Sequence, residues 1–154
     1  MPTFEHGQLD AIVADLLVAI LNQQLRDYVR TTPVTLQISE QAGIEPDHCF
    51  WLNDWAAVSG KRRIDLVTDP PPDIAVEIDV TNFTKIADYE RFKVPEVWLI
   101  RGDVLAIFAL TSEGYTQAES SQFFPDTAIS KRYQQVMAAI AEGASPPRAI
   151  RSVI

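Results

Sequence analysis

The chain has 154 residues with a formal net charge of −8, and 47% of its residues are hydrophobic. This apolar content excludes a disordered chain and predicts one globular domain over residues 1–154. The acidic balance counts against tight, nonspecific binding to duplex nucleic acid, because basic side chains supply that affinity by displacing counterions from phosphates.

The first third of the chain predicts a helix followed by two strands. Apolar residues recur at helical spacing from Leu9 to Leu21, which predicts an amphipathic helix over residues 8–28. Apolar and polar residues alternate over residues 34–38 and predict the first strand. The stretch after it contains a glycine and predicts a loop, and residues 48–52 then predict the second strand.

The middle of the chain predicts irregular connections that lead into an acidic strand. Residues 53–63 are polar and predict a loop, whereas residues 64–67 predict a short strand. The proline-rich residues 69–73 cannot continue a helix or a central strand, so they predict a stiff connector. Residues 74–80 alternate apolar and acidic side chains and predict a half-buried third strand.

The rest of the chain predicts, in order, a helix over residues 84–93, a strand over 97–101, a hairpin of strands over 104–110 and 115–119, and a helix over 128–142. From Gly143 onward, a Ser-Pro-Pro run predicts a frayed tail. The order of the elements predicts an α/β fold in which a mixed central sheet is flanked by helices.

Carboxylates carry the chemistry that this sequence offers. Glu77 and Asp79 alternate on the third predicted strand, so they share one face about 7 Å apart. Asp47 precedes the second predicted strand, and if these two strands pair, Asp47 and Glu77 can hold one hard cation. Two carboxylates suffice for Mg²⁺, which keeps several waters and can stabilise a pentavalent phosphate. The same pattern also arises from acidic residues that only face solvent.

Other reactive residues give weaker signals. His48 and Cys49 are neighbours on a predicted strand and face opposite ways, which counts against a zinc site and favours a core position for Cys49. The basic residues 61–63 and 131–132 form two local clusters, which we interpret as solvated surface.

Three features predict a cytoplasmic protein without membrane contact. No apolar run is long enough to span a membrane, and the first residues lack the layout of a secretory signal. The single cysteine excludes an internal disulfide and fits a reducing compartment.

Several of these segments together resemble a known family. The segments are Glu-Pro-Asp-His-Cys-Phe at residues 45–50, Pro-Pro-Pro-Asp-Ile-Ala-Val-Glu-Ile-Asp-Val at residues 70–80, Lys85, Tyr89, and Val-Pro-Glu-Val-Trp at residues 94–98. The combination resembles the Uma-type family of putative restriction endonucleases within the PD-(D/E)XK nuclease superfamily. The match is close over roughly residues 45–100 and looser elsewhere.

The resemblance implies a restriction-endonuclease-like core and a Mg²⁺- or Mn²⁺-dependent endonuclease that acts on DNA. It implies that Asp47 and Glu77 bind the metal. The superfamily places a lysine two residues after the glutamate, where this chain has Asp79, so Lys85 from the following helix would be the catalytic lysine and Asp79 would assist. A homodimer follows by analogy only. The alternative is an interaction module that keeps the nuclease fold and has lost turnover.

The resemblance leaves the roles of three residues open. Asp73 shares a face with Glu77 but lies about 13 Å from it on an extended strand, which is far for a shared ion. The family usually carries a hairpin with an acidic residue before its first helix, and this sequence lacks it; Glu5 or His6 is the candidate replacement. A basic groove beside the carboxylates would favour the enzyme over the interaction module.

Overall fold

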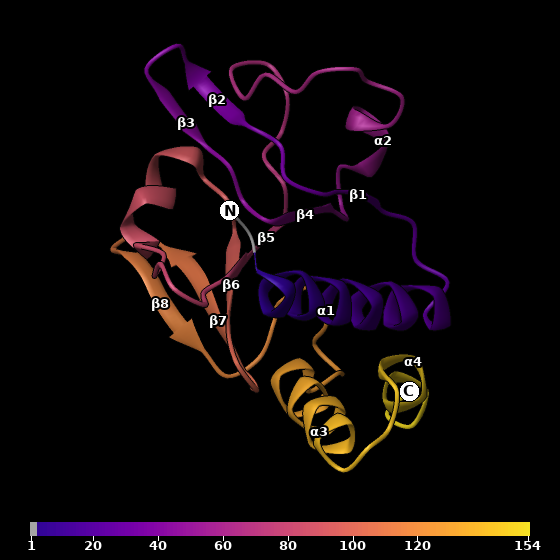
Figure 1. Ribbon diagram of the computed structural model, residues 1–154. Helices are drawn as coiled ribbons and strands as arrows, with labels where there is room; N and C mark the ends of the chain where they lie inside the picture. The colour runs from indigo at the N-terminus through magenta and orange to yellow at the C-terminus, as the bar shows by residue number, and fades with distance from the viewer. Residues whose placement is uncertain (1–2) are drawn as a thin grey trace.

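The structure of the protein is a computed structural model, which describes residues 3–154. In chain order, its elements are α1 (Phe4–Gln23), β1 (Val29–Thr31), β2 (Leu36–Ser39), β3 (Ala42–Ile44), β4 (His48–Trp51), α2 (Trp55–Val58), β5 (Ile74–Ile78), the 3₁₀ helix η1 (Ile86–Phe92), β6 (Glu96–Arg101), β7 (Val104–Thr111), β8 (Gly114–Ala118), α3 (Ile129–Ala141) and α4 (Pro146–Arg151). Figure 1 shows their arrangement. The predicted mixed α/β class is confirmed.

The central sheet has six strands in the order β1-β4-β5-β6-β7-β8. β5 and β6 pair in parallel, and every other neighbouring pair is antiparallel, so the sheet is mixed as predicted. A parallel pair needs a crossover connection, and the segment containing η1 supplies it between β5 and β6. β2 and β3 form a separate two-stranded hairpin.

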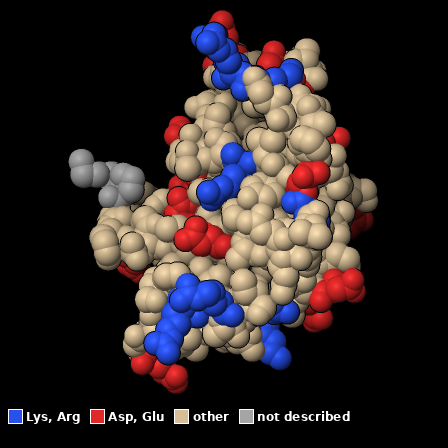
Figure 2. All heavy atoms as spheres, turned by 90° about the vertical axis from the view of Figure 1, so that its right-hand side faces the viewer, with Lys and Arg blue, Asp and Glu red and all other residues tan. Residues whose placement is uncertain are grey.

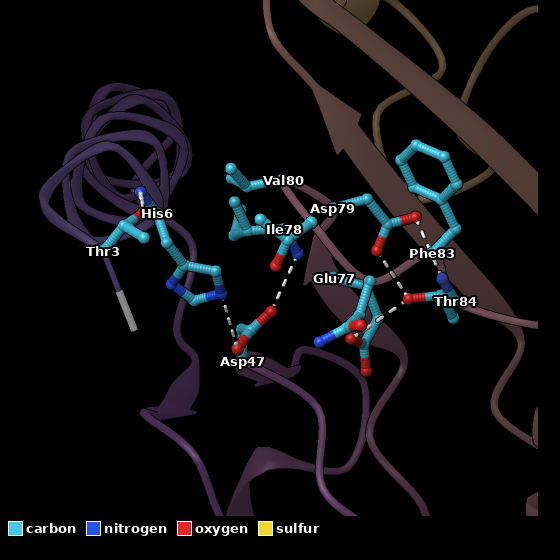
Figure 3. Close-up of a pocket in the computed structure, with 11 residues that line it drawn as sticks. Thr3, His6, Asp47, Glu77, Ile78, Asp79, Val80, Phe83 and Thr84 are labelled. Carbon is cyan, nitrogen blue, oxygen red and sulfur yellow. Dashed lines mark hydrogen bonds and ion pairs between the residues drawn. The ribbon is translucent and has the colours of Figure 1, made fainter. Parts of the chain in front are cut away.

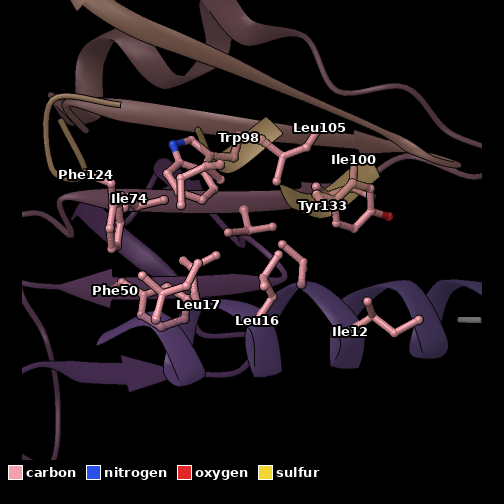
Figure 4. Packing of buried hydrophobic residues seen from close by; sticks show 14 of the residues in the cluster. Ile12, Leu16, Leu17, Phe50, Ile74, Trp98, Ile100, Leu105, Phe124 and Tyr133 are labelled. Carbon is pink, nitrogen blue, oxygen red and sulfur yellow. The ribbon is translucent and has the colours of Figure 1, made fainter. Parts of the chain in front are cut away.

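Helices cover one face of the sheet. α1, α3 and α4 lie on one side, while η1 and the β2–β3 hairpin lie on the other (Figure 1). In Figure 4, Leu16 and Leu17 of α1 lie between the helix and the strands that carry Phe50 and Ile74. Each of these side chains is at most 1% exposed, so α1 is an integral part of the core. Cys49 is also fully buried, as predicted.

The first helix runs over different residues from those predicted. It begins at Phe4, because Thr3 acts as the N-cap and its side chain accepts a hydrogen bond from the backbone N–H of His6. It ends at Gln23, just before Leu25 adopts a positive φ of 54°. Residues 24–28, the last part of the predicted helix, are not helical, and β1 follows at residues 29–31. A strand of three residues at the edge of a sheet is too short for its pattern of apolar residues to be recognised in the sequence.

Four further local predictions are wrong. Residues 42–44, expected in a loop, form β3, because pairing with β2 overrides the low strand propensity of glycine. Residues 55–58 form the short helix α2 inside a segment expected to be a loop, and residues 64–67 form no strand. The helix expected over residues 84–93 is the shorter 3₁₀ helix η1.

The expected frayed tail is also wrong, since residues 146–151 form α4. Prolines are tolerated in the first turn of a helix, where their missing N–H costs no hydrogen bond. Ser145 caps this turn by accepting a hydrogen bond from the N–H of Arg148. Ala149 and Ile150 are buried in the main core, and this burial holds α4 in place.

None of the helices described is both long and apolar enough to cross a membrane.

Candidate active site

A pocket of about 360 Å³ opens where the start of α1 meets the beginning of β4 and the end of β5 (Figure 3). Thr3 and His6 reach it from the start of α1, Asp47 from the residue before β4, and residues 77–84 from β5 and the loop that follows. The N–H of Asp47 donates to the carbonyl of Val76 at 3.1 Å. Pairing of β4 with β5 therefore places this carboxylate beside the acidic end of β5.

Asp47 is oriented by donors from two elements. Its Oδ2 accepts a hydrogen bond from the N–H of Ile78 at 2.8 Å, and its Oδ1 lies 3.2 Å from Nε2 of His6 (Figure 3). Burial raises the pKa of Asp47 above its ordinary value, although the contacts with Ile78 and His6 act in the opposite direction. The carboxylate is thus fixed in place, but its two contacts do not fully offset the free-energy cost of burying its charge.

Glu77 lies on β5 and is held by two hydroxyl groups. The hydroxyl of Tyr89 donates to its Oε1, and Oγ1 of Thr84 lies 3.3 Å from its Oε2 and shares its single proton between Glu77 and Asp79. Burial is the main cause that raises the pKa of Glu77 to about 7, and the charges of Asp47 and Asp79 add to it. Glu77 therefore titrates near neutral pH in the protein alone, and a cation in the pocket would hold it ionised.

Asp79 lies just beyond the end of β5 and is buried. It accepts hydrogen bonds from the N–H of Thr84 at 3.1 Å, from Oγ1 of Thr84 at 2.7 Å and from Nε of Arg101 at 3.3 Å. The guanidinium of Arg101 also lies 4.6 Å from the centre of the Phe83 ring. Because three donors already bind Asp79, its carboxylate fixes the loop of residues 80–84 and positions Arg101.

Lys85 is not brought into the pocket. It is the exposed residue before η1, and within residues 3–154 no hydrogen bond or ion pair joins its side chain to another residue. Tyr89, four residues after Lys85, is buried, and it contacts the site through Glu77.

Asp73 and Glu5 lie outside the pocket. Asp73 is buried, and its Oδ2 accepts the N–H groups of Leu52 at 2.6 Å and Asn53 at 2.9 Å, so it fixes the chain after β4. Glu5 is exposed in the first turn of α1, where a negative charge suits the helix N-terminus. Of the two candidates at the start of the helix, His6 is the one that reaches the site.

A second pair joins α1 to β4 beside the pocket. Nδ1 of His48 lies 2.8 Å from Oδ1 of Asp10, and the buried imidazole stacks on Phe50. His6 and Asp10 are one helical turn apart, so one face of α1 contacts the successive residues Asp47 and His48. The four-residue spacing of His6 and Asp10 is a signal that the sequence contained. No comparable pattern marks Thr84 or Arg101.

The pocket fits a hydrated hard cation better than a fully protein-coordinated one. Within residues 3–154, no group of three or more His, Cys, Asp or Glu side chains is arranged to hold a metal ion. Asp47 and Glu77 nevertheless line one open pocket, and burial raises the pKa of both. Two carboxylates with spare lone pairs match Mg²⁺, which retains most of its waters.

The protein has a mixed α/β fold, with helices on one face of the central sheet. It is similar to the crystal structure of a putative nuclease belonging to DUF820 from Anabaena variabilis, with a TM-score of 0.55, 12% sequence identity, and coverage of 100% of this chain and 84% of that one. The sequence model of the Uma2 family, described as putative restriction endonuclease, matches residues 1–137, and the chain belongs to this family. No curated protein matches it.

Proposed function

We propose that the protein is an endonuclease that hydrolyses DNA phosphodiester bonds with a Mg²⁺ or Mn²⁺ ion held by Asp47 and Glu77. One observation carries the proposal: two partly buried carboxylates from adjacent strands meet in one open pocket, and burial raises the pKa of both. Such a site is unfavourable for the protein alone and becomes favourable when a cation enters it. Membership in the Uma2 family supports the same chemistry.

The side chains around the carboxylates have distinct roles in this proposal. A bound divalent ion supplies charge stabilisation at the phosphate and lowers the pKa of a bound water. His6 and the N–H of Ile78 orient Asp47, while the hydroxyls of Thr84 and Tyr89 orient Glu77. Ligands held in one geometry before the substrate arrives reduce the cost of organising the site during reaction.

A cation is also needed to offset charge that builds on the phosphate during hydrolysis. We propose Lys85 for this role, because it follows Thr84, which lines the pocket, and its long side chain is free in solvent. Arg101 is the second candidate. It pairs with Asp79, at the position where the superfamily has its lysine, and thereby supplies positive charge beside the pocket.

Asp79 would then act as a positioning residue rather than as a metal ligand. Its three hydrogen bonds tie the loop of residues 80–84 to the end of β6. The proposal also includes a cytoplasmic location, a single domain over the whole chain and a homodimer as the active form. The dimer rests on analogy with nucleases of this fold.

The alternative function is a DNA-binding or protein-binding module without turnover. An acidic residue at position 79 and the exposed position of Lys85 outside the pocket favour it. The two functions differ in a cleavage assay on supercoiled plasmid and on single-stranded DNA, with Mg²⁺ or Mn²⁺.

Glu77→Gln is the test variant in that assay, because it removes one carboxylate charge from the pocket with little change in shape. Glu119→Gln is the matched control, since Glu119 is exposed and distant in sequence from the site. Metal-dependent cleavage by the unaltered protein and the control, but not by Glu77→Gln, would support the enzyme. No cleavage of either DNA with either metal would favour the module.

A further inference from the structure

We infer that a second pocket, at the other end of β4 from Asp47, binds the phosphates of a nucleic acid strand. The inference deepens the proposed function and rests on it for the choice of DNA as the ligand. It concerns the basic cluster at residues 61–63, which the sequence alone suggested to be solvated surface.

The pocket has a volume of about 250 Å³ and an uneven distribution of charge. Trp51, at the end of β4, and Val58, in α2, are buried and contribute to its apolar lining. Arg30 from β1 and residues 61–63 after α2 are four basic residues at the pocket, and no acidic residue lines it. This concentration is unexpected in a chain with only 13 Lys and Arg residues and a net charge of −8.

Three of the four basic side chains carry charge that the protein does not neutralise. Lys61 pairs with Asp69, which also accepts a hydrogen bond from the N–H of Asp65. For Arg30, Arg62 and Arg63, the described part of the chain offers no ion-pair partner within 4.0 Å, and all three are exposed. Unpaired guanidinium groups around one pocket match phosphate oxygens, which they can bind with two parallel hydrogen bonds.

The second basic cluster of the sequence behaves differently. The guanidinium of Arg132 donates to the carbonyl of Val153 and so links α3 to the chain after α4. That contact gives Arg132 a structural role. The convergence of four basic residues on a pocket therefore distinguishes residues 61–63 from an ordinary charged surface.

The two sites lie toward opposite ends of β4. Asp47 precedes β4 and Trp51 ends it, and four residues of strand span about 13 Å. Cys49, between them, is fully buried and packs with Leu36 and Val58, so a nucleic acid bound at both sites would pass over the segments that cover β4.

The pocket also bears on how a protein with a negative net charge can bind DNA. Figure 2 shows basic and acidic side chains on the same face of the molecule, with Lys and Arg atoms at its upper end. A local positive site attracts phosphates over roughly one Debye length, about 8–10 Å in physiological salt, whatever the total charge. DNA binding by this chain therefore depends on a few basic residues, and their removal should have a large effect.

The test is fluorescence anisotropy of a labelled single-stranded DNA at low salt in EDTA, so that neither metal nor cleavage contributes. The double variant Arg62→Gln/Arg63→Gln should raise Kd at least tenfold and lower the slope of log Kd against log salt by about one to two. The control Arg148→Gln/Arg151→Gln removes the same charge from exposed residues of α4 and should change Kd less than about twofold. Circular dichroism verifies that both double variants are folded.

Two results would overturn the inference. The first is that the unaltered protein does not bind the DNA, and the second is that both double variants weaken binding equally. If DNA binding depends on Arg62 and Arg63 but no metal supports cleavage, the proposed catalysis fails and the phosphate site stands.

Discussion

Asp79 and Arg101 form an ion pair between the ends of two adjacent parallel strands, with Nε of Arg101 3.3 Å from Oδ2 of Asp79. Ile78 pairs with Ile100 in the register of β5 and β6, so the next residue of each strand meets the other. The pair therefore follows directly from strand pairing, and it holds the loop of residues 80–84 at the edge of the acidic pocket.

The first prediction concerns this anchor. Asp79→Ala should destabilise the protein by about 1–3 kcal/mol, because it leaves two partly buried donors of Thr84 without their acceptor. Urea denaturation measures the change in the free energy of unfolding. Asp15→Ala, at an exposed site in α1, serves as control and should change it by less than about 0.5 kcal/mol. Equal stability of both variants would show that Asp79 does not anchor the loop.

The second prediction concerns metal binding. Calorimetric titration with Mn²⁺ should show one site in the unaltered protein, because Asp47 and Glu77 share the pocket. Asp47→Asn and Glu77→Gln should each weaken binding at least tenfold, whereas Glu119→Gln should not change it. Mn²⁺ binding that persists unchanged in both site variants would show that the metal binds elsewhere in the protein.

The third prediction concerns pH. The pKa of Glu77 is about 7 in the folded protein, against an ordinary value of 4.5, so the folded state keeps a proton that the unfolded chain loses first. The free energy of unfolding of the metal-free protein should therefore fall as the pH rises from 4.5 to about 7, and this contribution should level off above that.

The side chain introduced by Glu77→Gln cannot ionise, so the free energy of unfolding of this variant should lack that fall with rising pH. Thermal unfolding in EDTA should give the variant a higher Tm than the unaltered protein at pH 8 and a similar Tm near pH 4.5. Saturating Mn²⁺ should raise the Tm of the unaltered protein at pH 8 and leave that of the variant nearly unchanged. A constant difference in Tm between the two metal-free proteins at all pH values would contradict the assignment.

The fourth prediction concerns α1. Leu17 is fully buried against the sheet, so Leu17→Ala should destabilise the protein by roughly 2–5 kcal/mol. Leu25 is 92% exposed, and Leu25→Ala is the matched control, with an expected loss below about 0.5 kcal/mol. Chemical denaturation of both variants decides whether α1 is a core element.

The sequence revealed those parts of the fold that repeat a pattern over many residues. The apolar stripe from Leu9 to Leu21 and the alternation over residues 74–80 predicted α1 and β5, because burial of one face imposes the period of the element. β1 and β3 have three residues each and depend on their partner strands, so no local pattern marks them. α4 was missed because two prolines were taken as breakers rather than as residues of a first turn.

The site was predictable where it follows from strand pairing and not where it follows from loop conformation. Asp47 and Glu77 precede or occupy adjacent strands, and pairing brings them to one pocket. Thr84 and Arg101 reach the carboxylates from a loop and from the end of β6, and that contact requires the folded chain. Lys85 was assigned by resemblance, and its neighbour Thr84 faces the pocket while Lys85 faces solvent.

The last prediction compares the two candidate cations, Lys85 and Arg101. Lys85→Met should lower the rate of plasmid cleavage by about 10²-fold or more if its ammonium offsets charge on the phosphate, because an oriented charge is worth that much in a site of this kind. Folding and Mn²⁺ binding should be unchanged, since the side chain is exposed and outside the pocket. Lys131→Met removes one exposed lysine on α3 and is the control for net charge.

Arg101→Met separates this role from that of the ion pair. It should lower stability by only about 1 kcal/mol or less, because the side chain of Arg101 is 50% exposed. Lys85→Arg keeps the charge and should restore part of the rate lost in Lys85→Met. If Arg101→Met abolishes cleavage while Lys85→Met cleaves at the normal rate, Arg101 is the catalytic cation. In that case the guanidinium beside Asp79 offsets the charge on the phosphate.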